Sequence, residues 1–252
     1  MIHPPNVPHG TKILHFAAID STNDEARRQA DNGETGPMWI RADAQTKGRG
    51  RRGRSWLSEP GNLFMTGLIS LDCTPADAAN LSFVTALAVA DSIDHFVEPA
   101  IVQLKWPNDV LLSGRKTSGI LLESWPSKAG LQIAVGIGIN VVTKPENIGQ
   151  AITCINDHRL LNRNHCETAT LFVRVLHHFN MRLAQWREQG FEVTRAAWLA
   201  RAKGLGKTIT ARLPQDTLEG TFIGIGKDGA LELELPNGNR CFVSAGDVFF
   251  ER

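Results

Sequence analysis

The side chains with the clearest chemistry lie in one short segment rich in arginine and glycine. Five of the eight residues from Lys47 to Arg54 are cationic, and the other three are glycines. Two cations about 4 Å apart repel by about 4 kcal/mol at an effective dielectric near 20, and glycines raise the entropic cost of ordering the backbone. We therefore expect a loop that stays mobile until a polyanion neutralises it. Its arginines would grip phosphates, and its glycines would let the backbone approach them.

Two other interpretations of this segment remain open: a solvated basic loop, and a nucleic-acid contact of the RGG type. The run is short, occurs once and lies between two predicted core strands, which favours a loop that gates a site. The chain has 27 Lys and Arg against 26 Asp and Glu, a net charge of +1. A general affinity for nucleic acid or an anionic membrane is therefore not expected.

Further polar side chains stand at the ends of predicted strands. In Lys105-Trp106-Pro107-Asn108-Asp109 the proline stops a strand. Asp109 then either holds Mg²⁺, orients a nucleotide, or forms a simple turn with Asn108. Lys116 opens a later strand, and taken alone it would be an ordinary surface lysine. Asn140 ends the segment GIGIN, which lacks the spacing and the following helix of a dinucleotide-binding motif.

The sequence contains no nucleophile in a recognisable motif and no histidines or cysteines at metal-ligand spacing. Arg, Lys, Gly, Asn and Asp suit phosphate chemistry, in which catalysis comes mainly from positioning and charge stabilisation. The four cysteines lie far apart, and no signal peptide or long apolar stretch is visible. These features predict structural thiols and a cytoplasmic location.

The elements that must position these side chains can be outlined from periodicity. Strands are expected over residues 12–19, 38–42, 62–71, 102–106, 116–125 and 131–142. Helices are expected over residues 25–32, 75–97, 167–189 and 191–203. After residue 203, four or five short strands separated by turn residues predict a small β-barrel. We therefore expect a domain over residues 1–203 and a second over residues 204–252.

Four motifs in combination resemble the biotin protein ligase family. They are GRGRRGRSW at Gly48–Trp56, KWPND at Lys105–Asp109, RKTSGIL at Arg115–Leu121 and GIGIN at Gly136–Asn140. Ser21-Thr22-Asn23 upstream and Gln45 before the arginine segment also fit, and the resemblance covers almost the whole chain. It implies an α+β fold with a mixed or antiparallel sheet and flanking helices, similar to the ligase domain of class II aminoacyl-tRNA synthetases. A small SH3-like β-barrel would follow at the C-terminus.

The resemblance also implies an activity. Such enzymes condense biotin with ATP to give biotinyl-5′-AMP and pyrophosphate, and then transfer biotin to a lysine of a biotin carboxyl carrier domain. The expected substrates are biotin and ATP with Mg²⁺, and the expected partner is acetyl-CoA carboxylase or a related carboxylase, with no DNA and no membrane. Because only about twenty residues precede Ser21, we expect a monofunctional ligase without the DNA-binding domain of many bacterial relatives. A homodimer is left open, since a strand edge near residues 131–142 could pair two chains.

Roles for single residues follow from the same resemblance. Lys116 is expected to stabilise charge in the transition state, with Arg51 and Arg54 as phosphate-holding catalytic cations, and Arg51 matches the arginine that retains the intermediate. Biotin binding is expected at Ser21, Thr22, Asn23, Gln45, Gly48, Arg49, Arg51, Lys116 and Gly119. ATP binding is expected at Arg51, Arg54, Trp56, Lys105, Asn108, Asp109, Lys116 and Asn140, with Asp109 as the Mg²⁺ ligand.

Two alternative functions remain at this point. A lipoate–protein ligase or octanoyl transferase has a similar catalytic fold, but the arginine segment and the C-terminal β module are typical of the biotin branch. A nucleic-acid-binding protein without enzymatic activity would use the arginine loop and the β-barrel. It would bind with a steep salt dependence and would not need ATP.

Overall fold

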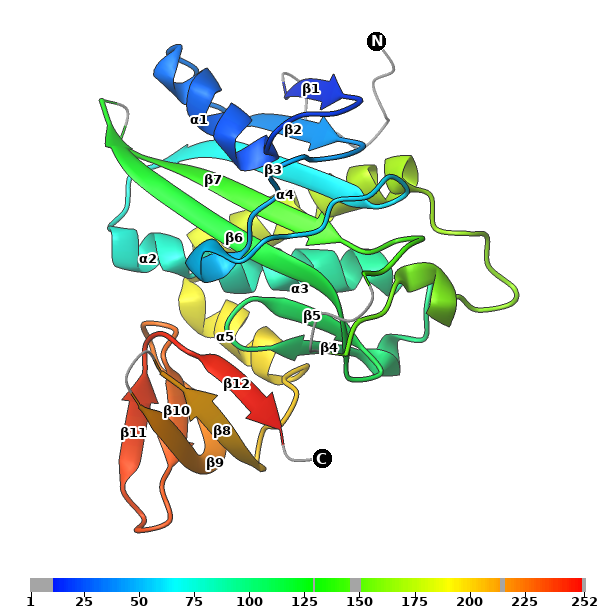
Figure 1. The fold of residues 1–252 in the computed structure, drawn as a ribbon. Coiled ribbons are helices and arrows are strands. Elements are labelled where there is room, and N and C mark those ends of the chain that lie inside the picture. The colour runs from blue at the N-terminus through cyan, green and yellow to red at the C-terminus, as the bar shows by residue number, and fades with distance from the viewer. Residues whose placement is uncertain (1–10, 129, 146–150, 214–215, 251–252) are drawn as a thin grey trace.

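In the computed structural model, which describes residues 11–128, 130–145, 151–213 and 216–250, a mixed seven-stranded sheet carries the main core. Its strand order is β1-β2-β3-β7-β6-β5-β4 (Figure 1). The strands are β1 (Lys12–Phe16), β2 (Met38–Ala42), β3 (Leu63–Leu71), β4 (Val102–Lys105), β5 (Asp109–Leu112), β6 (Arg115–Ser127) and β7 (Gly130–Ile139). β1 and β2 are parallel and the other neighbours are antiparallel, which confirms the predicted mixed sheet.

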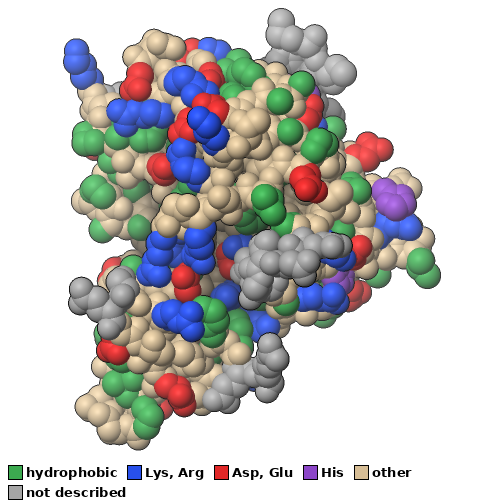
Figure 2. Space-filling model, in the orientation of Figure 1, with side chains coloured by type: hydrophobic (Ala, Val, Ile, Leu, Met, Phe, Trp, Pro, Cys, Tyr) green, Lys and Arg blue, Asp and Glu red, His purple; other side chains and the backbone are tan. Residues whose placement is uncertain are grey.

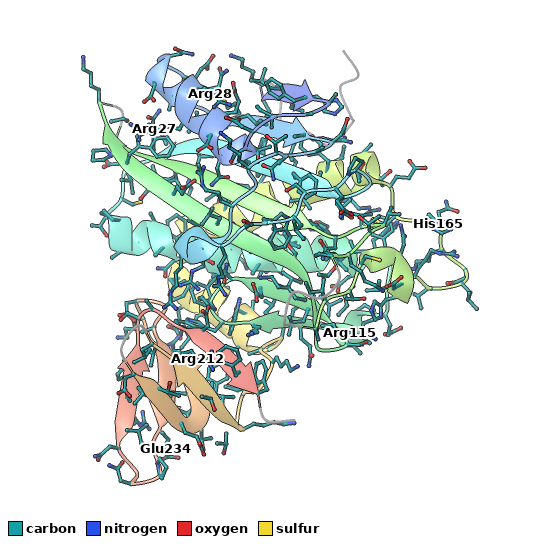
Figure 3. The ribbon with its side chains drawn as sticks, in the orientation of Figure 1. Arg27, Arg28, Arg115, His165, Arg212 and Glu234 are labelled. Carbon is teal, nitrogen blue, oxygen red and sulfur yellow. The ribbon has the colours of Figure 1, made fainter. Side chains whose placement is uncertain are left out.

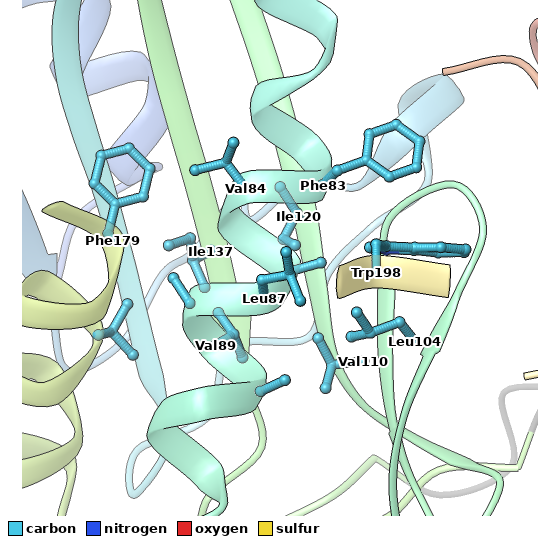
Figure 4. Close-up of a cluster of buried hydrophobic side chains, with 14 of the residues drawn as sticks. Phe83, Val84, Leu87, Val89, Leu104, Val110, Ile120, Ile137, Phe179 and Trp198 are labelled. Atoms are coloured by element: carbon cyan, nitrogen blue, oxygen red, sulfur yellow. The ribbon is translucent and has the colours of Figure 1, made fainter. Parts of the chain in front are cut away.

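The two faces of the sheet are covered differently. α3 (Leu81–Ile93), α4 (Thr168–Gln189) and α5 (Phe191–Leu199) pack together against one face, and α1 (Thr22–Asp31) packs on β3 and β7. Alternation along the strands sends one set of apolar side chains into the large core shown in Figure 4. A smaller set meets α1 on the opposite face. The face that carries α1 is therefore only partly filled, and this leaves room for a site.

The structure corrects two predicted elements and adds one. The single helix expected over residues 75–97 is wrong: α2 (Pro75–Ala79) ends at Asn80, where α3 begins. Asparagine has a low preference for helix interiors, but Asn80 keeps helical dihedral angles and its side chain makes no capping hydrogen bond, so the structure does not explain the break by a local side-chain contact. The expectation of a free strand edge near residues 131–142 is also wrong, because β7 lies between β3 and β6. The four-residue strand β5, too short for a periodicity to emerge, was missed.

The C-terminal segment forms a second, antiparallel sheet with five strands, as expected. They are β8 (Thr208–Arg212), β9 (Thr217–Ile225), β10 (Leu231–Glu234), β11 (Arg240–Val243) and β12 (Asp247–Phe250), in the order β11-β10-β9-β8-β12. The guanidinium of Arg212 lies 4.6 Å from the ring centroid of Phe249, at the edge that faces the large sheet (Figure 3). Trp106 Nε1, in the turn between β4 and β5, donates to the carbonyl of Gly229, 3.0 Å away. The two sheets thus share both core and hydrogen bonds.

The described helices include none that is both long and apolar enough to cross a membrane.

Candidate active site

A cavity of about 550 Å³ opens on the face of the large sheet that carries α1. Its walls come from the start of α1, the arginine-rich loop between β2 and β3, strands β6 and β7, and strand β12 of the C-terminal sheet. Figure 2 shows Lys and Arg side chains gathered where the two sheets meet. Segments from residue 21 to residue 249 therefore line one cavity.

The floor of the cavity consists of glycine backbone. Along β7, the isoleucines of the GIGIN segment enter the large core, and Gly136 and Gly138 between them face the cavity. Gly138 pairs with Gly119 of β6, and the indole of Trp56 lies on this pair. A Cβ built on Gly138 would stand 2.5 Å from Trp56 Cε2, and one on Gly119 would stand 2.8 Å from Trp56 Cζ3. The floor is therefore shaped for a flat ring, and any side chain would block it.

A buried ion pair lies beside this floor. Lys116 Nζ is 2.6 Å from Asp109 Oδ1, and their side chains are 17% and 12% exposed. A bulge in the β5–β6 pairing, with Val110 opposite Ser118 and Leu111 opposite Lys116, turns Lys116 towards the cavity. Its backbone is also held by the segment that follows β7, through hydrogen bonds of 2.9 Å to residues 151 and 153. Lys116 is thus held on both sides of its backbone, although it lies at the start of β6.

Other cations converge on the same carboxylate. Burial lowers the pKa of Lys105, the neighbouring Lys116 lowers it further, and Asp109 partly offsets both effects. Burial also lowers the pKa of Arg51; the charge of Asp247 and, to a smaller extent, that of Asp109 oppose that shift. Cations buried together in this way attract phosphate strongly, because water does not screen them.

The end of the cavity beside α1 is a network of hydrogen-bonded polar side chains. Gln45 Oε1 accepts from the backbone N–H and the hydroxyl of Thr22, at 2.8 and 3.1 Å. The hydroxyl of Thr66 lies 2.8 Å from that of Thr22 and 2.7 Å from Asn23 Oδ1. Asn23 Nδ2 donates to Glu123, 2.7 Å away. A urea-like ring, which needs both donors and acceptors, finds both kinds of group here.

The start of α1 is anchored so that these side chains keep their places. Ser21 caps the helix by accepting from Asp24 N at 3.3 Å. Arg28, labelled on α1 in Figure 3, pairs with Asp20 and Glu25. The hydrogen bond from Arg28 holds the pKa of Asp20 at about 2.

The arginine-rich loop bridges the two ends of the cavity. Arg49 pairs with Asp24 at 2.5 Å and with Glu123 at 3.3 Å. Arg51 lies in a 3₁₀ turn (Arg51–Gly53) and reaches Asn108 Oδ1 at 3.4 Å. The mutual repulsion predicted for these cations is therefore offset in part by carboxylates from other segments.

Almost all of the predicted site residues line this cavity. The exception is Gly48, which lies beneath it: a Cβ there would stand 2.5 Å from Ser58 Oγ. Asn140 lines the cavity, but its side-chain amide donates to the carbonyl of Thr153 at 3.2 Å and so also fastens that segment. The sequence reasoning missed Thr66, Glu123, Asp247 and Phe249, because isolated residues on distant strands carry no motif.

Asp109 by itself does not fit a resident metal ion. Within the described residues, no group of three or more His, Cys, Asp and Glu side chains could hold one, and the near oxygen of Asp109 is occupied by Lys116. Mg²⁺ usually keeps several waters and binds one or two carboxylates together with substrate phosphates. It fits this cavity only as part of a nucleotide substrate.

Comparisons with known proteins agree on one kind of relative. Residues 16–140 match the biotin/lipoate A/B protein ligase family, and residues 204–251 match the biotin protein ligase C-terminal domain. A biotin–[acetyl-CoA-carboxylase] ligase from Paracoccus denitrificans is 40% identical over 242 residues, which cover 93% of this chain and 99% of that protein. The bifunctional ligase/repressor BirA of Bacillus subtilis (strain 168) is 30% identical over 241 residues, covering 94% and 73%.

Solved structures give the same result. A biotin protein ligase from Aquifex aeolicus in complex with biotin and ATP superimposes with a TM-score of 0.77 at 27% identity, covering 96% of this chain and 99% of that one. A biotin protein ligase from Leishmania major in complex with biotinyl-5-AMP gives a TM-score of 0.65 at 26% identity, covering 96% and 100%.

Proposed function

This chain belongs to the biotin protein ligases of the biotin/lipoate A/B protein ligase family, and we propose that the cavity on the α1 face performs both steps of their reaction. In the first step a carboxylate oxygen of biotin attacks the α-phosphorus of ATP, and pyrophosphate leaves. In the second, a lysine amine of a carboxylase's biotin carboxyl carrier domain attacks the acyl carbon of biotinyl-5′-AMP. AMP leaves, the amine loses a proton, and an amide bond remains.

The observation that carries this proposal is the position of Lys116, between the glycine floor and the buried cations. A carboxylate and a phosphate are both anions, so they repel each other as they approach. A fixed cation between them reduces this repulsion, and the reduction is largest in the transition state, where the two groups are closest. We assign this role to Lys116, with Asp109 as the group that holds its ammonium in place before substrates arrive. Arg51 and Arg54 are assigned to the phosphates.

The remaining residues are assigned by position. The polar end formed by Ser21, Thr22, Asn23 and Gln45 would hold the ureido ring, with Gly48 and Arg49 closing the loop over it, and Gly119 would lie under the ligand. Trp56 would leave the floor and pack on the nucleotide or the acyl chain. Lys105, Asn108 and Asn140 would complete the ATP site, with Mg²⁺ entering as MgATP beside Asp109.

We also propose the domain boundary and the location. Residues 1–203 would form the catalytic unit and residues 204–252 a β unit that closes the cavity, which is supported by the five-stranded sheet and by the separate family match over 204–251. A cytoplasmic location is supported by four cysteines that are all free thiols.

Intact-protein mass spectrometry tests the function directly. The chain is mixed with MgATP and an apo biotin carboxyl carrier domain, with biotin in one tube and lipoate in another. We expect the carrier to gain the mass of one biotin less one water, only with ATP and only with biotin. A gain with lipoate instead would assign the chain to the lipoate ligases, and no gain in either tube would refute the proposal.

A further inference from the structure

Strand β12 of the C-terminal sheet brings a carboxylate to the arginine-rich loop. Asp247 Oδ1 lies 3.0 Å from Arg54 Nη2, and its Oδ2 lies 3.3 Å from Arg52 Nη1. Its side chain is 24% exposed, against 37% and 59% for the two arginines. One carboxylate thus bridges two cations of the loop, and all its contacts with the loop cross from one sheet to the other.

Arg51 contacts the residue just before β12, and this contact differs from those of Arg52 and Arg54 with Asp247. Arg51 Nη1 reaches the carbonyl of Gly246 and Asn108 Oδ1, each at 3.4 Å. These are long hydrogen bonds to neutral oxygens, so neither contact neutralises the guanidinium, although the charge of Asp247 also acts on it. Arg52 and Arg54 are therefore paired with a carboxylate of the C-terminal sheet, whereas Arg51 reaches that sheet only through a carbonyl; Arg51 and Arg54 both line the cavity.

The ion pairs of Arg52 and Arg54 with Asp247 explain how so cationic a loop can stay closed. A glycine-rich loop with five cations in eight residues is expected to repel itself and to leave the cavity open. Arg52 has a φ of 56°, a left-handed conformation that costs energy in a residue other than glycine and needs support from its surroundings. The two ion pairs to Asp247 supply this support at the tip of the loop.

We propose that Asp247 is a positioning residue that holds the arginine-rich loop closed over the cavity through Arg52 and Arg54. Arg51 is thereby kept directed into the cavity before any nucleotide binds. The consequence for the reaction, which rests on the proposed function, is that the closed loop retains the biotinyl-5′-AMP formed beneath it. Loss of the Asp247 carboxylate opens the loop and lets the intermediate escape before the carrier arrives.

Limited trypsin digestion of the full chain without ligands tests the contact independently of the reaction. Trypsin must take the Arg52 or Arg54 side chain into its own pocket, so pairing with Asp247 protects both peptide bonds. Exposed pairs of this kind are worth up to about 1 kcal/mol each. We therefore expect Asp247→Asn to speed cleavage after Arg52 and Arg54 by about threefold to tenfold.

Three controls separate loop release from general loosening. Cleavage after Lys227, an exposed residue in a turn of the same sheet, should keep its rate in Asp247→Asn. Glu219→Gln removes one charge from an exposed position of β9 and should change nothing. Asp247→Glu keeps the carboxylate and should restore most of the protection. Equal cleavage of the loop in wild type and Asp247→Asn would overturn the proposal, as would an equal rise after Lys227.

The retention role has its own measurement. With biotin and MgATP, hydroxylamine traps released biotinyl-5′-AMP as a hydroxamate, and carrier labelling is followed in parallel. We expect Asp247→Asn to raise hydroxamate relative to labelled carrier by at least threefold. An unchanged ratio would overturn retention. If the wild type forms neither product while its loop is still protected, the proposed function fails and the contact stands.

Discussion

Replacing Lys116 by methionine separates its chemical role from its structural one. The substitution keeps most of the buried side-chain volume and removes the charge 2.6 Å from Asp109 Oδ1. At an effective dielectric near 20, the Coulomb attraction across that distance is about 6 kcal/mol. Desolvation of both groups opposes it, and breaking a buried pair typically costs about 3–5 kcal/mol. Lys105 and Arg51 still face the carboxylate, so we expect a loss of about 2–3 kcal/mol of unfolding free energy.

The substitution should also slow the formation of biotinyl-5′-AMP, for a reason separate from its effect on stability. A fixed charge that acts on the transition state contributes about a hundredfold to a thousandfold, so Lys116→Met should slow biotin-dependent pyrophosphate exchange by that factor. Urea unfolding and pyrophosphate exchange are measured on the same preparations. Lys203→Met is the matched control, because it also removes a partly buried lysine but from outside the cavity lining.

The double variant Asp109→Asn with Lys116→Met decides between the two roles. Without the negative charge, methionine at position 116 no longer leaves an unpaired carboxylate, so stability should return to within about 1 kcal/mol of wild type. Adenylation should stay as slow as in the single variant. If the double variant regains its rate, Lys116 acts only by neutralising Asp109. Near-wild-type exchange in Lys116→Met would remove the lysine from the mechanism altogether.

Further predictions concern the floor, the polar end and the thiols. Gly138→Ala places a methyl group 2.5 Å from a Trp56 ring atom and should weaken biotin binding at least about tenfold by calorimetry; unchanged affinity would mean that the ligand does not use this floor. Thr66→Val leaves buried partners unsatisfied and should cost about 1–3 kcal/mol in urea unfolding. Burial raises the pKa of Cys166 to about 12, so the thiolate that alkylates is scarce below that pH. Iodoacetamide at pH 8 should modify Cys166 in urea and spare it in the folded protein, as peptide mass mapping would show.

The sequence predicted some element boundaries to the residue. The strand over residues 38–42 and the end of α4 at Gly190 agree with the structure to the residue. Gly190 has a φ of 77°, which glycine adopts without strain. The break at Asn80 was not predictable from periodicity, because apolar residues continue with a helical period on both sides of it.

The candidate site was predictable as a set of motifs, and its geometry was not. The arginine loop was found from its unusual composition. Asp109 was one of several open interpretations after a strand-ending proline, and the role of Lys116 came only from the resemblance to the biotin protein ligases. Thr66 belongs to an apolar strand, and a single threonine is common in such strands, so the sequence does not mark it as a site residue. The pairing of Asp109 with Lys116 depends on the bulge in β6, since a regular strand would direct Lys116 to the other face. Such irregularities in strand pairing arise from tertiary packing, and the hydrophobic periodicity of the sequence does not reveal them.

The cavity joins the beginning of α1 to strand β12, more than two hundred residues later. During synthesis the large sheet can pack before β12 exists, but the cavity cannot close until residue 249 has left the ribosome. Closure of the cavity therefore depends on a contact between distant parts of the chain, which is expected to form late in folding. A fragment that ends before β12 would bury most of the same core and have no closed site. A column that carries an immobilised substrate would therefore retain chains in which β12 has been synthesised and has packed against the large sheet.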